Sequence, residues 1–218
     1  KTKVYGAANP ALTATLTGFV NGETLGTSAV TGTAAVTTTA TLTSPATTYV
    51  ITPALGDLAA ANYAFATFTD GVLTVGQKAL TVTADAKTKV YGAANPALTA
   101  TITGFANGET LATSGVTGAA SVTTTATALT GVGSATLTAA VGTLVSANYA
   151  FTFTAGALTI TKAPLTVTAN PVGRVYGAAN PALTATLTGF VNGETLGTSG
   201  VTGTAAVTTT ATLTSPAT

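Results

Sequence analysis

The residues that could perform acid–base or metal chemistry are few in this chain. It has 218 residues, with six Asp or Glu, seven Lys or Arg, and no His or Cys. Without His and Cys the chain cannot form a Ser-His or Cys-His nucleophile pair or a common zinc site. The carboxylates are also widely spaced in sequence, whereas acid–base pairs and calcium sites need several together. The sequence therefore predicts no catalytic, cofactor-binding or metal-binding residues, and we expect that the protein is not an enzyme.

Three of the acidic residues recur in one context. Glu23, Glu109 and Glu194 each follow an Asn-Gly pair. A carboxylate at this place is interpreted as the cap of a turn or of a short helix, beside the positive end of its dipole. The other three acidic residues, Asp57, Asp70 and Asp85, are scattered. Asp57 and Asp70 have no counterpart in the middle repeat.

Three tyrosines also recur, at Tyr5, Tyr91 and Tyr176. An aromatic face could stack on a sugar ring, but a tyrosine at the end of a strand more often packs on its own module with its hydroxyl bonded to backbone. We favour the packed interpretation. Lys78 and Lys162 lie where an intramolecular isopeptide bond could start, but no buried carboxylate can be assigned beside them. We expect no such bond, and an intact mass equal to the sequence mass would confirm this.

Composition narrows the class of partner. Charged residues make up 6% of the chain and the net charge is +1. No basic stripe is available to neutralise phosphates, so nucleic acid is not an expected partner. The stretch from Thr110 to Thr161 has no charge, but glycines interrupt it and threonine alternates with small apolar residues, so we expect no membrane span. Thr supplies about a quarter of all residues, which favours strands and turns.

Internal repetition dominates the organisation of the chain. The run that begins Tyr5-Gly6-Ala7-Ala8-Asn9-Pro10 returns at Tyr91 and Tyr176. The segment from Phe19 (FVNGETL) returns from Phe105 and Phe190, and NYAF from Asn62 returns from Asn148. Residues 1–47 match residues 172–218 at all but four positions. The period is long enough for a small independent domain, so we predict modules at 1–77, 78–162 and 163–218, of which only the second is complete.

Alternation of apolar residues with threonine predicts the strands. The expected strands run through Leu12–Leu16, Leu80–Ala84, Tyr149–Phe153, Leu158–Ile160 and a segment with Tyr49 and Ile51 or Leu137, with their equivalents in other repeats. In the first repeat one extra residue separates Phe65 from Phe68, which indicates a β-bulge. Glu23-Thr24-Leu25 is the one plausible helical turn. The predicted core of the second module comprises Leu80, Val82, Leu98, Ile102, Phe105, Leu137, Val141, Leu144, Phe151, Phe153, Leu158 and Ile160.

The run VYGAANPALTATLTGFVNGETL, followed downstream by NYAF, GALTITKAPLTVTA and another VYG, resembles the YGX-type MBG domains of bacterial surface adhesins and filamentous-haemagglutinin-like exoproteins. The resemblance implies a mainly β fold, a tandem array of β-grasp-like modules or, alternatively, immunoglobulin-like β-sandwich modules. It also implies an extracellular or bacterial cell-surface location. The alanines after each Tyr-Gly pair depart from the acidic residues expected there, which weakens any ligand-binding role more than the fold.

Two functions fit the resemblance. The first is a structural stalk or fibre segment of a large repetitive surface protein, in which neighbouring modules of the same chain are the partners and lateral self-association forms fibres. The second is a module that binds a glycan or a host protein directly. The monotony of the repeats favours the stalk. Because both ends fall inside a repeat, we expect the sequence to be part of a much longer native polypeptide.

Overall fold

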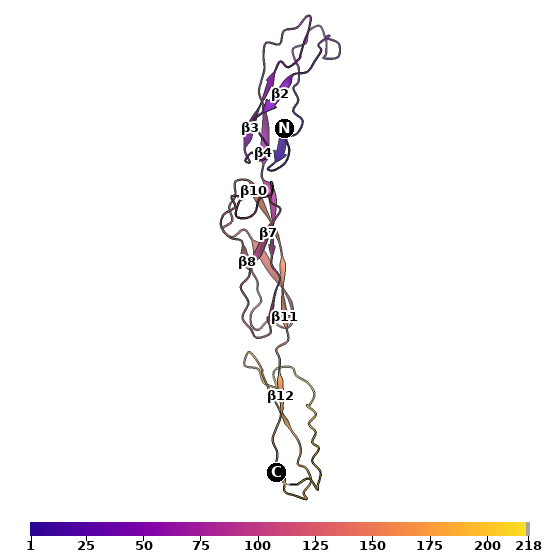
Figure 1. The fold of residues 1–218 in the computed structure, drawn as a ribbon, viewed down its shortest axis with the longest axis vertical. Helices are drawn as coiled ribbons and strands as arrows, with labels where there is room; N and C mark the ends of the chain where they lie inside the picture. The colour runs from indigo at the N-terminus through magenta and orange to yellow at the C-terminus, as the bar shows by residue number, and fades with distance from the viewer. Residues whose placement is uncertain (217–218) are drawn as a thin grey trace. The chain divides into compact units, whose positions relative to one another are not determined.

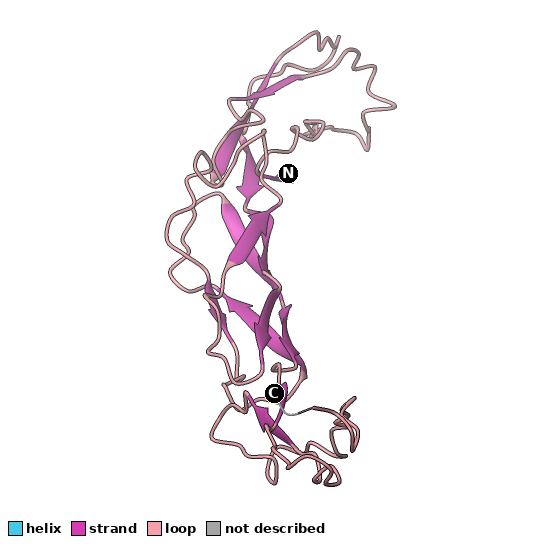
Figure 2. Cartoon of the chain, turned by 60° about the horizontal axis from the view of Figure 1, so that its bottom comes forward, coloured by secondary structure: helices cyan, strands magenta, loops and turns pink. Residues whose placement is uncertain are grey.

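The structure is a computed structural model in which residues 1–216 are described (Figure 1). All regular structure in these residues is β, as Figure 2 shows, so the mainly β prediction is confirmed. The last two residues of the predicted third module lie outside the described residues. Within the described part, no helix has the length and apolarity that a bilayer crossing requires.

The short helix expected at Glu23–Leu25 is wrong, because this segment forms turns instead. The Glu23 N–H donates to the Val20 carbonyl at 3.0 Å across a turn whose Asn21 has a φ of 55°. The Thr27 hydroxyl then accepts from the Thr24 N–H at 2.8 Å. Such local side-chain bonds compete with the backbone bonds of a helix, so the segment does not continue as one.

The chain divides into two compact units that do not coincide with the sequence repeats. The first consists of Lys1–Ala84, Thr99–Val122 and Ala139–Ala155. The second consists of Asp85–Leu98, Thr123–Thr138 and Gly156–Thr218. Each unit therefore joins parts of two successive repeats.

The first unit contains a four-stranded sheet and a three-stranded sheet. The four-stranded sheet has the order β1-β4-β3-β2, with β1 and β4 parallel and the other pairs antiparallel. Its strands are Thr2–Val4 (β1), Ala35–Thr38 (β2), Thr48–Ala54 (β3) and Gly71–Gly76 (β4). The three-stranded sheet has the order β10-β5-β7, in which β5 is parallel to β10 and antiparallel to β7. Its strands are Lys78–Ala84 (β5), Ala100–Thr103 (β7) and Tyr149–Thr154 (β10).

The second unit contains most of another four-stranded sheet and a two-stranded sheet. The four-stranded sheet has the order β6-β11-β9-β8 and repeats the arrangement of the first repeat's sheet, with β6 and β11 parallel. Its strands are Lys87–Val90 (β6), Ser121–Thr123 (β8), Gly133–Ala140 (β9) and Gly156–Thr161 (β11). The two-stranded sheet pairs Thr166–Ala169 (β12) with Ala185–Thr188 (β13) in antiparallel fashion.

Two segments of the first repeat form no strand because the strand that pairs with their equivalents is absent there. The segment Tyr63–Phe68 corresponds to β10, and residues 14–17 correspond to β7, yet neither is a strand. In the second repeat β5 lies between these two segments and bonds both, and the first repeat has no equivalent of β5 in the sequence. The expected strand at Leu12–Leu16 and the expected bulge between Phe65 and Phe68 are therefore wrong in the first repeat, although the corresponding strands in the second repeat are confirmed.

The core of the second repeat agrees with the alternation in most places. Leu80, Val82, Leu137 and Leu158 are fully buried, and Ile160 and Leu144 are also buried. Tyr149, at 1% exposed, is the largest fully buried side chain of the described residues. Leu98, Ile102, Phe105 and Phe151 are half-buried. Two predicted core residues are wrong: Val141 is 47% exposed just after β9 ends, and Phe153 is 41% exposed near the end of β10.

Candidate functional site at the repeat junctions

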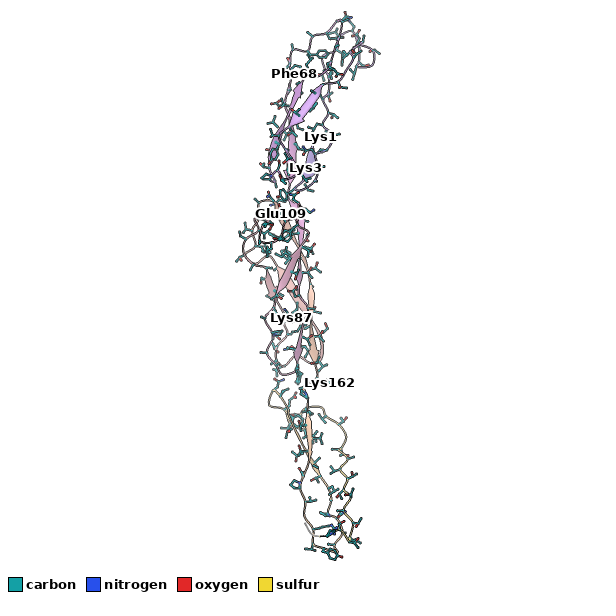
Figure 3. All side chains as sticks on the ribbon, viewed as in Figure 1. Lys1, Lys3, Phe68, Lys87, Glu109 and Lys162 are labelled. Atoms are coloured by element: carbon teal, nitrogen blue, oxygen red, sulfur yellow. The ribbon has the colours of Figure 1, made fainter. Side chains whose placement is uncertain are left out.

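The recurrent glutamate is presented by a tight turn. In the second repeat Asn107 and Gly108 have φ values of 53° and 72°, a left-handed conformation that Asn and Gly adopt at low cost. The Glu109 N–H donates to the Ala106 carbonyl at 2.8 Å and closes this turn. The carboxylate of Glu109 is then half-buried in the first unit, where Figure 3 labels it.

Two tyrosine hydroxyls from different repeats donate to this one carboxylate. Tyr149, from the same repeat, donates to Glu109 Oε2 at 2.5 Å, and Tyr5, from the preceding repeat, donates to Glu109 Oε1 at 2.5 Å. The Tyr149 oxygen also accepts from the Ala106 N–H at 2.9 Å. Hydrogen bonds to an ionised acceptor are the stronger kind. The carboxylate therefore links the two repeats.

Aromatic and backbone packing surrounds these hydrogen bonds. The Tyr5 and Tyr149 rings meet edge to face at 5.4 Å, and Phe105 meets Tyr149 likewise at 5.8 Å, a favoured geometry for aromatic pairs. A Cβ placed on Gly6 would lie 2.3 Å from the Ala106 Cβ. Glycine after Tyr5 is therefore required for the close approach of the first two repeats.

The electrostatics of the junction follow from burial and hydrogen bonding. Burial would raise the pKa of Glu109, but hydrogen bonds from Tyr149, Tyr5 and Asn107 outweigh it, so the pKa lies below its ordinary value. Burial and the bond to Glu109 raise the pKa of Tyr149 to about 12. The same carboxylate, with a smaller contribution from burial, raises the pKa of Tyr5. At neutral pH the site therefore consists of one anion and two neutral phenols.

The same contacts recur along the chain. In the second unit Tyr91 donates to Glu194 Oε1 at 2.7 Å, and a Cβ on Gly92 would lie 2.5 Å from the Val191 side chain. In the first repeat Tyr63 donates to Glu23, the within-repeat half of the arrangement. Tyr176 belongs to the last repeat, where the sequence contains no following glutamate turn, and it is 70% exposed.

A cation bonds the backbone beside each Tyr-Gly turn, and in the first two repeats this cation is buried. Lys3 is 8% exposed, and its Nζ donates to the carbonyls of Ala7 at 3.1 Å and Thr41 at 2.5 Å. Lys89 does the same toward Ala93 and Thr127, at 3.2 and 2.6 Å. Arg174 takes this place in the third repeat, with a bond of 2.8 Å to the Ala178 carbonyl. These carbonyls replace the water that a buried cation loses.

The structure changes the interpretation of the recurrent residues. The carboxylates of the recurrent glutamates accept hydrogen bonds from tyrosine hydroxyls. The prediction that these carboxylates cap a turn or a short helix is therefore wrong. Tyr5 and Tyr91 are packed as expected, but their hydroxyls bond to the following repeat instead of to backbone of their own. The cation two residues before each tyrosine is a signal that the sequence analysis missed. No group of three or more His, Cys, Asp or Glu gathers within residues 1–216.

Together these contacts define a tandem array of β modules in which each repeat bonds the next through its most regular motifs. The sequence matches the MBG domain (YGX type) family over residues 1–74, 80–159 and 165–217, and the chain belongs to this family. No curated protein and no solved structure matches the chain.

Proposed function

We propose that this chain is a structural stalk or fibre segment of a large repetitive extracellular surface protein, and that it has no enzymatic activity. The observation that carries the proposal is the use of the recurrent motifs. Tyr-Gly and Asn-Gly-Glu, the most regular features of the repeats, bond one repeat to the next at both junctions. A spacer requires contacts of this kind, which fix how one repeat follows the next.

The repeat fold supports the same proposal. Immunoglobulin-like sandwiches are built from antiparallel sheets, whereas here the first and last segments of the repeat pair in parallel, as β5 with β10 and β6 with β11. We therefore favour the β-grasp-like module, without its helix, with module limits at 1–77, 78–162 and 163–218. Because these neighbouring strands are parallel, the chain enters a module at one end and leaves it at the other, which suits connection of modules in series.

Direct binding of a glycan or host protein is less well supported. Tyr5 is 5% exposed and Tyr149 is 1% exposed, so neither offers a ring face to a sugar. A glycan array probed with the full chain tests this alternative. Because Tyr176 is 70% exposed, the array is repeated with the Tyr176→Ala variant. Specific binding by both chains would favour direct binding over the stalk.

The stalk function requires junctions with a narrow range of angles. Spin labels at Thr52→Cys and Thr103→Cys, both exposed and both in the first unit, report the distance across the first junction. We expect a narrow distance distribution by double electron–electron resonance, which Glu109→Ala broadens. Glu23→Ala is the matched control, because Glu23 bonds Tyr63 of its own repeat, and it should leave the distribution narrow. A broad distribution in the unsubstituted chain would contradict the stalk function.

A further inference from the structure

Tyrosine is the most easily oxidised side chain in this sequence. The 218 residues include six tyrosines but no Cys, Met, Trp or His. The thiols and thioethers that oxidants usually attack first in a protein are therefore missing. A one-electron oxidant that reaches this chain removes its electron from a phenol.

Two of these phenols are arranged for coupling to each other. The Tyr5 and Tyr149 rings lie 5.4 Å apart, centre to centre, with an angle of 83° between their planes. Among the described residues this is the one aromatic contact between two tyrosines, since the others join Phe to Tyr. Both hydroxyls donate to the same carboxylate, that of Glu109, which Figure 3 labels. The ring carbons beside each hydroxyl, where phenoxyl radicals couple, therefore converge as well.

Glu109 supplies the base that oxidation of a phenol needs. A phenol gives up an electron readily when its proton leaves at the same time, and a hydrogen-bonded carboxylate is positioned to accept that proton. Glu109 is half-buried, so it can pass the first proton to water before it accepts the second. Tyr5 and Tyr149 are 5% and 1% exposed. Radicals formed on these two rings therefore meet each other before they meet a second chain.

We propose that one-electron oxidation joins Tyr5 and Tyr149 as a dityrosine that ties the first repeat covalently to the second. Each phenol loses one electron and its hydroxyl proton, and the proton passes to Glu109. The two radicals form a carbon–carbon bond between their ortho positions, and the hydrogen on each of these carbons then moves to the phenol oxygen. Hydrogen peroxide, acting through a haem peroxidase, accepts the two electrons and two protons and becomes two water molecules. The modification stands on the geometry of three side chains, independently of the stalk function.

Oxidation of the Tyr176→Phe chain tests the cross-link. This background removes a phenol that is 70% exposed and would join separate chains. The dilute chain is treated with a haem peroxidase, hydrogen peroxide and a small diffusible mediator, and is then denatured and digested with trypsin. We expect blue dityrosine fluorescence and peptide 4–78 joined to peptide 90–162, with two hydrogens fewer than the sum of the two. Fragmentation spectra should place the link on Tyr5 and Tyr149.

Variants in the same background assign the link to its residues. Tyr5→Phe keeps the ring but should abolish the cross-link. Tyr49→Phe is the matched control on the same tryptic peptide, and it should leave the yield unchanged because Tyr49 bonds the Pro45 carbonyl. Glu109→Gln should slow the coupling by roughly tenfold or more, because its amide is no base. Circular dichroism checks that each variant is folded.

Unfolding separates the role of proximity from the reactivity of the phenols. In denaturing urea the tyrosines keep their chemistry but lose their arrangement, so the link between Tyr5 and Tyr149 should become no more frequent than other tyrosine pairs. The proposal is overturned if the folded chain yields no link between the two peptides or if the link persists in Tyr5→Phe. It is also overturned if urea leaves the yield unchanged, or if Glu109→Gln couples as fast as its parent.

Discussion

At the scale of single residues, the junction depends on a carboxylate shared by two tyrosines. Glu109 joins Tyr149 of its own repeat to Tyr5 of the preceding one. Neither bond has a local signature in sequence, because Glu109 lies 104 positions from Tyr5 and 40 positions from Tyr149. The sequence could predict that these residue types matter, since they recur, but not that they meet. The expectation of a cap rested on the neighbouring Asn-Gly alone.

Removal of the Tyr149 hydroxyl should destabilise the first unit. Tyr149→Phe leaves the buried Ala106 N–H without its 2.9 Å acceptor and removes one donor from Glu109. An unsatisfied buried donor costs about 1–3 kcal/mol of unfolding free energy. Urea denaturation measures this loss. Tyr63→Phe is the control, because Tyr63 is only half-buried and its removal should cost less; equal losses in the two variants would contradict the prediction.

The junction should be insensitive to pH near neutrality and weaken at both extremes. The folded pKa of Glu109 lies below its ordinary 4.5, so its contribution is complete above that pH and is lost as the pH falls through the folded value. The folded pKa of Tyr149 is raised from 10.0 to about 12, so its contribution is present below pH 10 and is lost as the pH rises through 12. Melting temperatures across pH measure both limbs. Glu109→Gln should abolish the loss of melting temperature at acid pH that comes from Glu109. An unchanged loss at acid pH would show that another group causes it.

At the scale of elements, a strand forms only where its neighbours are present. Alternation correctly predicted β5, β7, β10 and β11 in the second repeat, because these strands have one apolar face over a core. The same pattern failed in the first repeat, where residues 63–68 lack the strand that bonds them. Alternation also could not predict that Phe153 lies near the end of its strand, where packing is incomplete. Local alternation predicts which face of a strand is apolar. It does not predict which strands pair, because the partners come from distant parts of the chain.

The same valine should therefore have different energetic weight in two equivalent strands. Val82 in β5 is 0% exposed and Val167 in β12 is 55% exposed. Val82→Ala should cost about 1–3 kcal/mol through lost burial and a residual cavity. Val167→Ala should cost much less, because little burial is lost. Urea denaturation of both variants makes the comparison, and similar losses would show that Val167 is buried in solution.

Two equivalent glycines separate backbone strain from contact between repeats. Gly6 and Gly177 have φ values of 78° and 79°, which strain any side chain. An added Cβ at Gly6 would overlap Ala106, whereas at Gly177 it meets nothing within 4 Å. Gly6→Ala should therefore lower the melting temperature more than Gly177→Ala. Equal effects would show that the two repeats do not approach as closely as described.

At the scale of the whole molecule, stability rests on packing and hydrogen bonds, with few charges to assist. Only 6% of residues are charged, and the buried cations Lys3 and Lys89 bond carbonyls instead of carboxylates. Added salt screens charge pairs, so the melting temperature should change little between low salt and 1 M sodium chloride. Differential scanning calorimetry checks this, and a strong shift would indicate charge contacts that the described residues do not account for.

The parallel pairing of the first and last segments of each repeat also determines how the chain bears tension. In the second repeat the chain enters through β5 and β6 and leaves through β10 and β11, and the two runs lie side by side in the same direction. A pull on the two ends therefore slides one run along the other. Their hydrogen bonds are loaded together, whereas a hairpin pulled from its open end loses them one at a time. Resistance to force depends on the rate of unfolding, so the complete second repeat should be the mechanically strongest segment of the chain.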